Sequence, residues 1–172
     1  MIQNLMAYEE AGYKVVHKGE NFEIRYYEER IVIQTRYDSG NSGFRKLFNY
    51  ISGQNQGEKK IEMTTPVTEL QNDNQMVMQF YLPARFNASS APLPADNSLE
   101  IATIDAGYFA VIQYSGFASN KNFYKHAQIL KSSLDRDNIK ISSQPIKATY
   151  DGPFTLPNLR RNEAMYLVLW DK

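Results

Sequence analysis

The feature that most constrains the fold is an internal repeat, because the second half of the chain shows the same order of predicted elements as the first. Phe22–Ser39 aligns without a gap on Leu99–Gly116, at an offset of 77 residues that carries Phe22 to Leu99. The apolar pattern of a helix recurs at a similar distance, from Phe44 to Phe123. Each half is therefore predicted to be a strand–strand–helix–strand–strand unit, and an internal duplication is the economical interpretation.

Two such units can bury their apolar faces only against each other. We therefore expect a single α+β domain over residues 1–172, with repeats at about 13–83 and 99–170. The predicted architecture is a distorted β-barrel of two pseudo-two-fold-related strand and helix repeats, with two helices packed on the sheet. A concave surface between such units is a natural ligand site.

Strands are predicted wherever apolar and polar residues alternate between turn signals. They are Tyr13–Lys18, Phe22–Tyr27, Ile31–Tyr37, Ile61–Leu70, Met76–Leu82 and Ala164–Trp170. Two helices are predicted from apolar residues at helical spacing, the first between Ser42 and Gly53 and the second between Ser119 and Arg136. Their apolar faces are Phe44, Leu47, Phe48 and Ile51 in the first helix and Phe123, Ala127, Leu130 and Leu134 in the second.

Composition excludes several classes of function. The chain has no cysteine, so disulfides, thiolate metal sites and cysteine nucleophiles are absent. Its 19 basic and 19 acidic residues give a formal net charge of zero, which argues against a nucleic-acid partner. No stretch is long and apolar enough for a membrane span, and the first residues lack the pattern of a signal peptide, so we expect a cytoplasmic protein. The 12 Tyr, 9 Phe and 1 Trp indicate a thick core or an apolar pocket for a flat ligand.

Four stretches of sequence carry a resemblance to a known family. They are FEIRYYEE from Phe22, GFRKLFNYISGQNQ from Gly43, KIEMTTPVT from Lys60 and RRNEAMYLVL from Arg160. In this order and spacing they resemble the SOUL haem-binding protein family, over about Tyr13–Trp170. The resemblance implies a distorted barrel of two pseudo-symmetric halves and the binding of haem b or another tetrapyrrole, with no catalytic cycle firmly attached. The chain also looks like the effector-binding domain of multidrug-responsive transcription activators, which is an analogy of fold only.

The resemblance implies two ways to hold a porphyrin. Some members place a histidine directly after E-I-R as an axial iron ligand, and here that position is Tyr26. A tyrosine can ligate ferric haem, but the alternation of Tyr26 with Phe22 and Ile24 favours a core position. Other members hold the ring in an open apolar groove beside the first helix, with basic residues near the propionates. The matching positions here are Phe44, Arg45, Leu47, Phe48, Ile51, Met63, Phe154 and Leu156.

Each of these residues also has a purely structural interpretation. Helical spacing favours packing on the sheet for most of the first helix's apolar residues. Met63 is more often a filler of irregular cores than a haem ligand. His126, a second candidate iron ligand, lies at the boundary of the core on the second helix, and the two histidines have no metal-site spacing. The apolar loop around Phe154 either forms a lip of the binding site or caps the barrel.

The sequence favours a soluble haem-binding or tetrapyrrole-binding protein that acts as a carrier, buffer or sensor, without a required axial ligand from the protein. Two alternatives stay open. One is an effector-binding module for amphipathic organic molecules, which would bind unrelated planar dyes and be indifferent to the metal. The other is an enzyme acting on a tetrapyrrole, although no G-x-S-x-G, P-loop, H-E-x-x-H or G-x-G-x-x-G motif is present.

Overall fold

The computed structural model describes residues 8–38 and 42–171. The helices in this part of the chain are α1 (Ser42–Ile51), α2 (Asn120–Arg136) and a short 3-10 helix, η1 (Pro157–Leu159). The first strands are β1 (Glu9–Glu10), β2 (Tyr13–Lys18), β3 (Glu23–Tyr27), β4 (Arg30–Tyr37), β5 (Thr64–Thr65), β6 (Val67–Asn72) and β7 (Gln75–Tyr81). The later strands are β8 (Leu99–Ile104), β9 (Gly107–Tyr114), β10 (Lys140–Ile141), β11 (Ile146–Thr149) and β12 (Asn162–Leu169).

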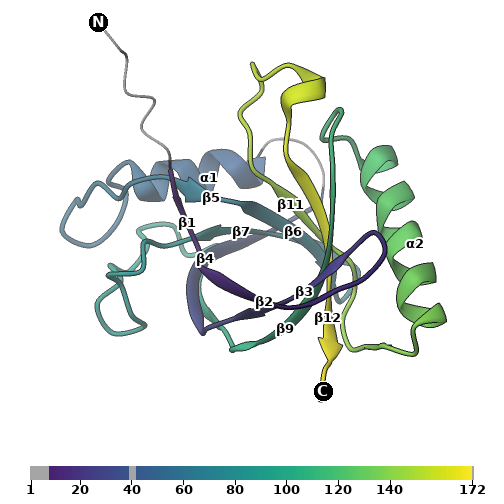
Figure 1. Ribbon diagram of the computed structural model, residues 1–172. Helices are drawn as coiled ribbons and strands as arrows, with labels where there is room; N and C mark the ends of the chain where they lie inside the picture. The colour runs from purple at the N-terminus through teal and green to yellow at the C-terminus, as the bar shows by residue number, and fades with distance from the viewer. Residues whose placement is uncertain (1–7, 39–41, 172) are drawn as a thin grey trace, which may run out of the picture.

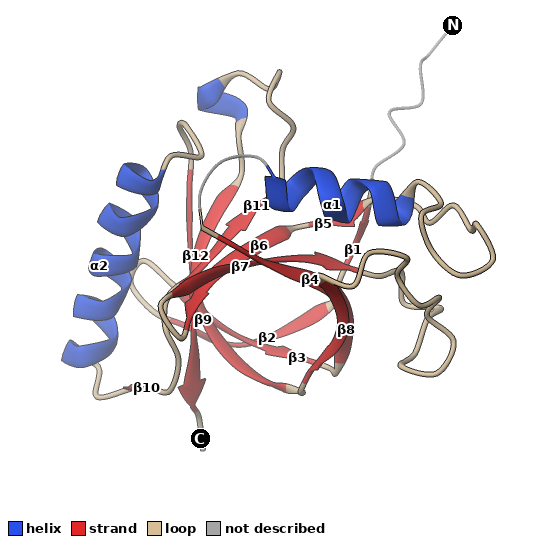
Figure 2. Cartoon of the chain, turned by 180° about the vertical axis from the view of Figure 1, so that it is seen from behind, coloured by secondary structure: helices blue, strands red, loops and turns tan. Residues whose placement is uncertain are grey.

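One large antiparallel sheet forms the body of the molecule. Its strand order is β2-β3-β9-β12-β11-β6-β7-β4-β8, and β10 pairs with β12 beside that path. The sheet curls strongly, with both α-helices on its outer side (Figures 1 and 2). Among the described strands no hydrogen bonds join β2 to β8. The predicted α+β fold is confirmed, and the sheet is a curved, barrel-like one that stays open between its two edge strands.

Read from either end, the sheet shows corresponding strands in the same order, and offsets of 77 or 79 residues relate every pair except β7 and β12. From β3 to β8, β3 corresponds to β8, β9 to β4, β12 to β7 and β11 to β6. The register agrees, since Ile24 pairs with Ala110 and Ile101 pairs with Ile33, and a shift of 77 residues carries one pair onto the other. A duplicated unit would produce this arrangement, and the duplication itself stays a prediction.

Each helix covers its own apolar cluster on the outer face of the sheet. Under α2 the buried residues include the predicted Phe123, Ala127, Leu130 and Leu134. Ser119 caps this helix by accepting a hydrogen bond from the backbone N–H of Asn122. The outer face of the sheet under α2 is therefore sealed by the helix side chains that helical spacing predicts.

The buried face of α1 differs from the predicted one. Gly43, Leu47, Tyr50 and Ile51 are buried, while Phe44 and Phe48 are exposed. Tyr50 can occupy the core because its hydroxyl donates to the carbonyl oxygen of Pro92 at 2.7 Å. Gly43 lets the ring of Tyr37 approach closely, as a Cβ there would lie 3.2 Å from it. The helix is thus rotated so that two phenylalanines face outward.

The predicted strand over Ile61–Leu70 is wrong in its first half. Only Thr64–Thr65 is extended there, as β5, and it pairs in parallel with β1 rather than joining the large sheet. β6 begins at Val67, directly after Pro66, which has no N–H to donate to a strand ladder.

Burial of tyrosines predicts how stability depends on alkaline pH. Burial raises the pKa of Tyr27, Tyr50 and Tyr114 to about 12. The unfolded chain loses these protons near pH 10 and the folded protein near pH 12, so the free energy of unfolding should fall as pH rises from about 10 to 12. Urea unfolding across this range checks the expectation, and Tyr114→Phe should show a weaker pH dependence. A free energy of unfolding that stays constant to pH 12 would contradict it.

Candidate functional site

The outward face of α1 presents two aromatic rings to solvent. The rings of Phe44 and Phe48 stack with centroids 6.1 Å apart and planes 13° apart. Phe44 also meets Phe80 edge-on at 5.2 Å, which ties the pair to the core. Their side chains are 41% and 49% exposed, and Arg45 beside them is exposed as well. The result is a flat, accessible aromatic surface next to a cation.

The other candidates of the predicted groove divide into two groups. Leu47 and Ile51 lie in the core under α1, so a ligand on the helix surface would touch neither in this conformation. Met63 is half-buried and packs against the same core cluster. Phe154 and Leu156 lie in the loop between β11 and β12, and the Phe154 side chain is 99% exposed.

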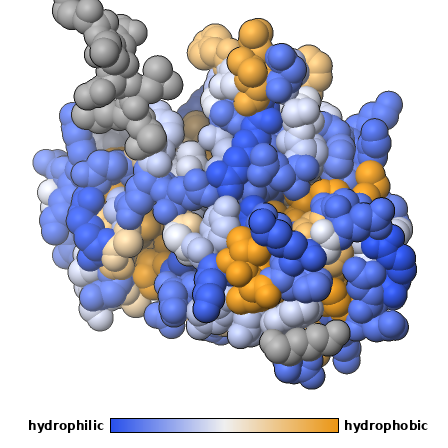
Figure 3. All heavy atoms as spheres, in the orientation of Figure 1, coloured by the Kyte–Doolittle hydropathy of each residue, from blue (hydrophilic) through white to orange (hydrophobic). Residues whose placement is uncertain are grey.

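That loop is a fixed structure although its apolar side chains face solvent. The guanidinium of Arg160 donates to the carbonyl oxygens of Thr155 and Pro153 at 2.9 and 2.8 Å. The loop stands at the same end of the sheet as the start of α1 (Figures 1 and 2). Hydrophobic side chains gather at its tip in the space-filling view (Figure 3). The loop and α1 thus offer apolar side chains at one end of the molecule.

The two candidate iron ligands lie away from α1. His126 stacks on Tyr114 with ring centroids 4.0 Å apart, and its Nδ1 lies 2.8 Å from the carbonyl oxygen of Asn122. Tyr26 is half-buried on β3 with its ring 5.2 Å from that of Tyr108. Within residues 8–38 and 42–171 no group of three or more His, Cys, Asp or Glu side chains could hold a metal ion.

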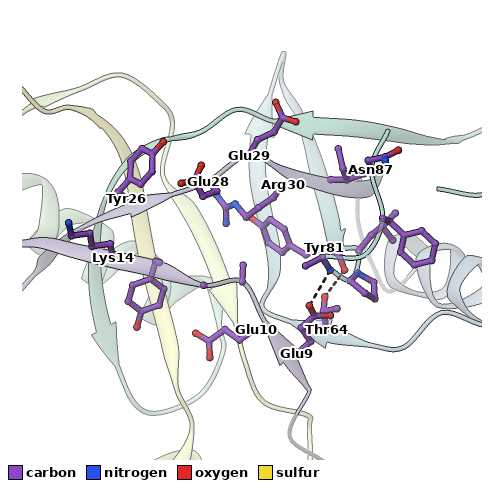
Figure 4. A pocket seen from close by; sticks show the side chains of 18 residues that line it. Glu9, Glu10, Lys14, Tyr26, Glu28, Glu29, Arg30, Thr64, Tyr81 and Asn87 are labelled. Carbon is purple, nitrogen blue, oxygen red and sulfur yellow. Dashed lines mark hydrogen bonds between the residues drawn. The ribbon is translucent and has the colours of Figure 1, made fainter. Parts of the chain in front are cut away.

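A cavity of about 810 Å³ opens at the corner between β3 and β4 (Figure 4). Its walls come from the segment around β1 and the start of β2, from the β3–β4 turn and from the end of β7 with the loop that follows. The aromatic lining residues are Tyr13, Tyr26, Tyr81 and Phe86, and the charged ones are Glu9, Glu10, Lys14, Glu28, Glu29 and Arg30. Of the predicted site residues, only Tyr26 lines this cavity.

The inner side of the sheet holds a buried ionic cluster that sequence reasoning missed. Arg25 donates a hydrogen bond from each of its two Nη atoms to the carboxylate of Glu163, both at 3.0 Å, and the two residues are 3% and 0% exposed. Tyr150 donates to the same carboxylate at 2.8 Å, and Arg161 reaches it at 3.0 Å. Burial alone would lower the pKa of Arg25, but the hydrogen bonds and charge of Glu163 outweigh it and raise that pKa.

This cluster joins two of the motifs noted in the sequence. Arg25 belongs to the E-I-R stretch and Glu163 to the R-N-E stretch. Arg161, from the second stretch, also binds Glu10 of β1 at 2.9 Å and stacks over the ring of Tyr150 at 3.8 Å. Residues of the two motifs therefore connect β3 to β12 inside the sheet and attach the β1 segment to both.

Among the residues that the structure describes, no helix is long and apolar enough to cross a membrane.

Comparison with known proteins places the chain in a family. The SOUL heme-binding protein model matches residues 8–167. Heme-binding protein 1 of Xenopus laevis is 28% identical over 171 residues, covering 90% of this chain and 89% of that protein. Heme-binding protein 2 of Homo sapiens is 27% identical, covering 86% and 78%. The crystal structure of the EcmrR C-terminal domain shares the fold, with a TM-score of 0.62 at 16% identity over 91% of this chain and 98% of that one. Since the family model spans nearly the whole chain, this protein belongs to the SOUL haem-binding protein family.

Proposed function

We propose that this protein binds haem or another tetrapyrrole reversibly on the outward face of α1 and serves as a soluble carrier, buffer or sensor. The observation that carries the proposal is the stacked, solvent-exposed pair Phe44 and Phe48. Two exposed aromatic rings that lie nearly parallel offer a flat apolar surface whose burial by a ligand is favourable. Membership of a haem-binding family supplies the class of ligand.

The residues at this surface suit a planar amphipathic dianion. Phe44 and Phe48 would lie against the macrocycle, and Phe154 and Leu156 offer a second apolar wall from the late loop. Arg45 is exposed beside the rings and would pair with a propionate. The bound group would supply the iron or the conjugated ring, while the protein supplies apolar contact and a cation.

Apolar contact can supply a large part of the binding free energy. At ~25 cal/mol per Å², covering about 300 Å² of apolar surface contributes roughly 7.5 kcal/mol, from which the cost of lost translational and rotational freedom is subtracted. A micromolar complex, at ~8 kcal/mol, therefore also needs the second apolar wall and the ion pair with Arg45. Of the candidate iron ligands, His126 lies on α2 and Tyr26 on β3, away from this surface. We therefore expect binding to depend little on the metal.

A titration tests the proposal directly. Hemin and metal-free protoporphyrin IX should each bind at one-to-one stoichiometry with similar affinity, measured by absorbance difference. The double substitution Phe44→Ser with Phe48→Ser should weaken both by at least about tenfold, since it removes most of the apolar contact. Leu169→Ser is the matched control, because Leu169 is an exposed apolar residue at the far end of β12.

Two outcomes would contradict the proposal. Unchanged affinity in the double variant would remove α1 as the binding surface. A strong preference for hemin over metal-free protoporphyrin IX would instead indicate an axial ligand, and His126→Ala and Tyr26→Phe would then identify it.

A further inference from the structure

Arg30 occupies an unusual environment at the cavity between β3 and β4. Its guanidinium carbon lies 4.2 Å from the ring centre of Tyr27, 4.8 Å from that of Tyr81 and 5.5 Å from that of Phe109. All three rings are buried. The positive charge is therefore enclosed by aromatic faces, which stabilise a cation but accept no conventional hydrogen bond from its N–H groups.

The Arg30 guanidinium has an unsatisfied donor among the residues that the structure describes. Its Nε is buried without a hydrogen bond, and no ion pair or hydrogen bond joins the side chain to any residue that the structure describes. A buried donor without a partner is costly and uncommon. Nε has almost no accessible surface, whereas the two Nη groups are not among the buried unpaired atoms. Since Arg30 lines the cavity and lies between Tyr26 and Tyr81 (Figure 4), a ligand carboxylate in the cavity could accept hydrogen bonds from these Nη groups.

The carboxylates of the cavity do not compensate Arg30. Glu10 is bound by Arg161 at 2.9 Å, and Glu9 accepts the backbone N–H of Ala84 at 3.1 Å. Glu28 and Glu29 are exposed in the β3–β4 turn, and among the described residues neither forms an ion pair with Arg30. Four carboxylates and two cations, Lys14 and Arg30, therefore line the cavity. A ligand that carries one negative group meets less repulsion there than a ligand that carries several.

We propose that this cavity is a second binding site, distinct from the α1 surface, for an aromatic monocarboxylate. The carboxylate would accept hydrogen bonds from the Arg30 guanidinium, and the ring system would pack among Tyr13, Tyr26, Tyr81 and Phe86. The cavity volume of about 810 Å³ accommodates a molecule of two or three fused rings. The site takes organic acids smaller and less charged than a tetrapyrrole.

Matched naphthalene probes test the assignment by calorimetry on the intact protein. Naphthoate should bind at least about tenfold more tightly than naphthalenemethanol, naphthylmethylammonium or naphthalenedicarboxylate. Arg30→Met should remove that preference, and Arg30→Lys should keep part of it. Arg36→Met is the control, because Arg36 is an exposed arginine on the same strand. Phe44→Ser with Phe48→Ser should leave naphthoate binding unchanged, which separates this site from the haem proposal.

A second measurement does not depend on the stability of a variant. In the nuclear magnetic resonance spectrum of the wild-type protein, naphthoate should shift the Nε–H signal of Arg30 and the backbone signals of residues 9–14 and 81–87. Equal affinity for the acid and the alcohol, tighter binding of the ammonium probe, or shifts confined to α1 would each overturn the proposal.

Discussion

Replacing Glu163 by alanine is expected to lower the free energy of unfolding by about 3–5 kcal/mol. The Glu163 carboxylate is fully buried and accepts hydrogen bonds from Arg25, Tyr150 and Arg161 at 2.8 to 3.2 Å. Its removal leaves the Arg25 guanidinium buried without its main counter-charge, and the cost of that uncompensated charge exceeds the value of the ion pair itself. The loss should also loosen β1, because Arg161 holds Glu10.

Urea unfolding followed by circular dichroism measures this effect. Glu62→Ala is the control, since Glu62 pairs with Arg85 in full contact with solvent and its loss should cause no measurable change. The double variant Arg25→Met with Glu163→Leu should be more stable than Glu163→Ala, because it removes both buried charges together. If Glu163→Ala were as stable as the wild type, the Arg25 guanidinium would have to be solvated in the variant, which would show that water reaches the cluster.

Leu47→Ala is expected to destabilise the protein by about 2–5 kcal/mol while leaving hemin affinity nearly unchanged. Leu47 is fully buried under α1, so the substitution opens a cavity in the core. The double substitution of Phe44 and Phe48 by serine should show the opposite pattern, with a large loss of hemin affinity and a smaller loss of stability, because both side chains are nearly half exposed.

The comparison separates the stability of α1 from the binding role that we propose for it. Unfolding in urea gives the stability of each variant, and absorbance titration gives its hemin affinity. If Leu47→Ala abolished hemin binding at temperatures where the variant is fully folded, the ligand would have to enter the core beneath α1. The expected site on the helix surface would then be wrong.

Much of the fold follows from local patterns in the sequence. Alternation and helical spacing predicted the strands around β2, β3, β4 and β7 and the four apolar residues of the inner face of α2, although not the buried Ser133. The orientation of α1 could not be predicted, because Phe44, Leu47, Phe48, Tyr50 and Ile51 are all apolar enough to face the sheet. Contacts between distant residues set the orientation of α1. The hydroxyl of Tyr50 donates a hydrogen bond to the carbonyl oxygen of Pro92, and the missing side chain of Gly43 leaves room for the ring of Tyr37.

The site was less predictable than the fold. Helical spacing predicted which residues of α1 are apolar, but it did not predict that Phe44 and Phe48, the two proposed for binding, stay exposed. Arg25 and Glu163 stood within motifs noted in the sequence, yet their contact joins strands 138 residues apart and leaves no local pattern. Arg30 follows two glutamates and resembles an ordinary turn residue. Only the folded sheet shows that three aromatic rings surround it while both glutamates turn to solvent.

The position of β12 in the sheet has a consequence for biosynthesis. β12 is the last strand along the chain, yet it lies between β9 and β11 and joins the two parts of the sheet. A nascent chain that lacks it presents two open edges, on β9 and on β11, which are templates for pairing with other chains. Productive folding should therefore wait until β12 has been synthesised. Chaperone occupancy on ribosome-bound chains should persist until β12 emerges, and truncations before it should aggregate.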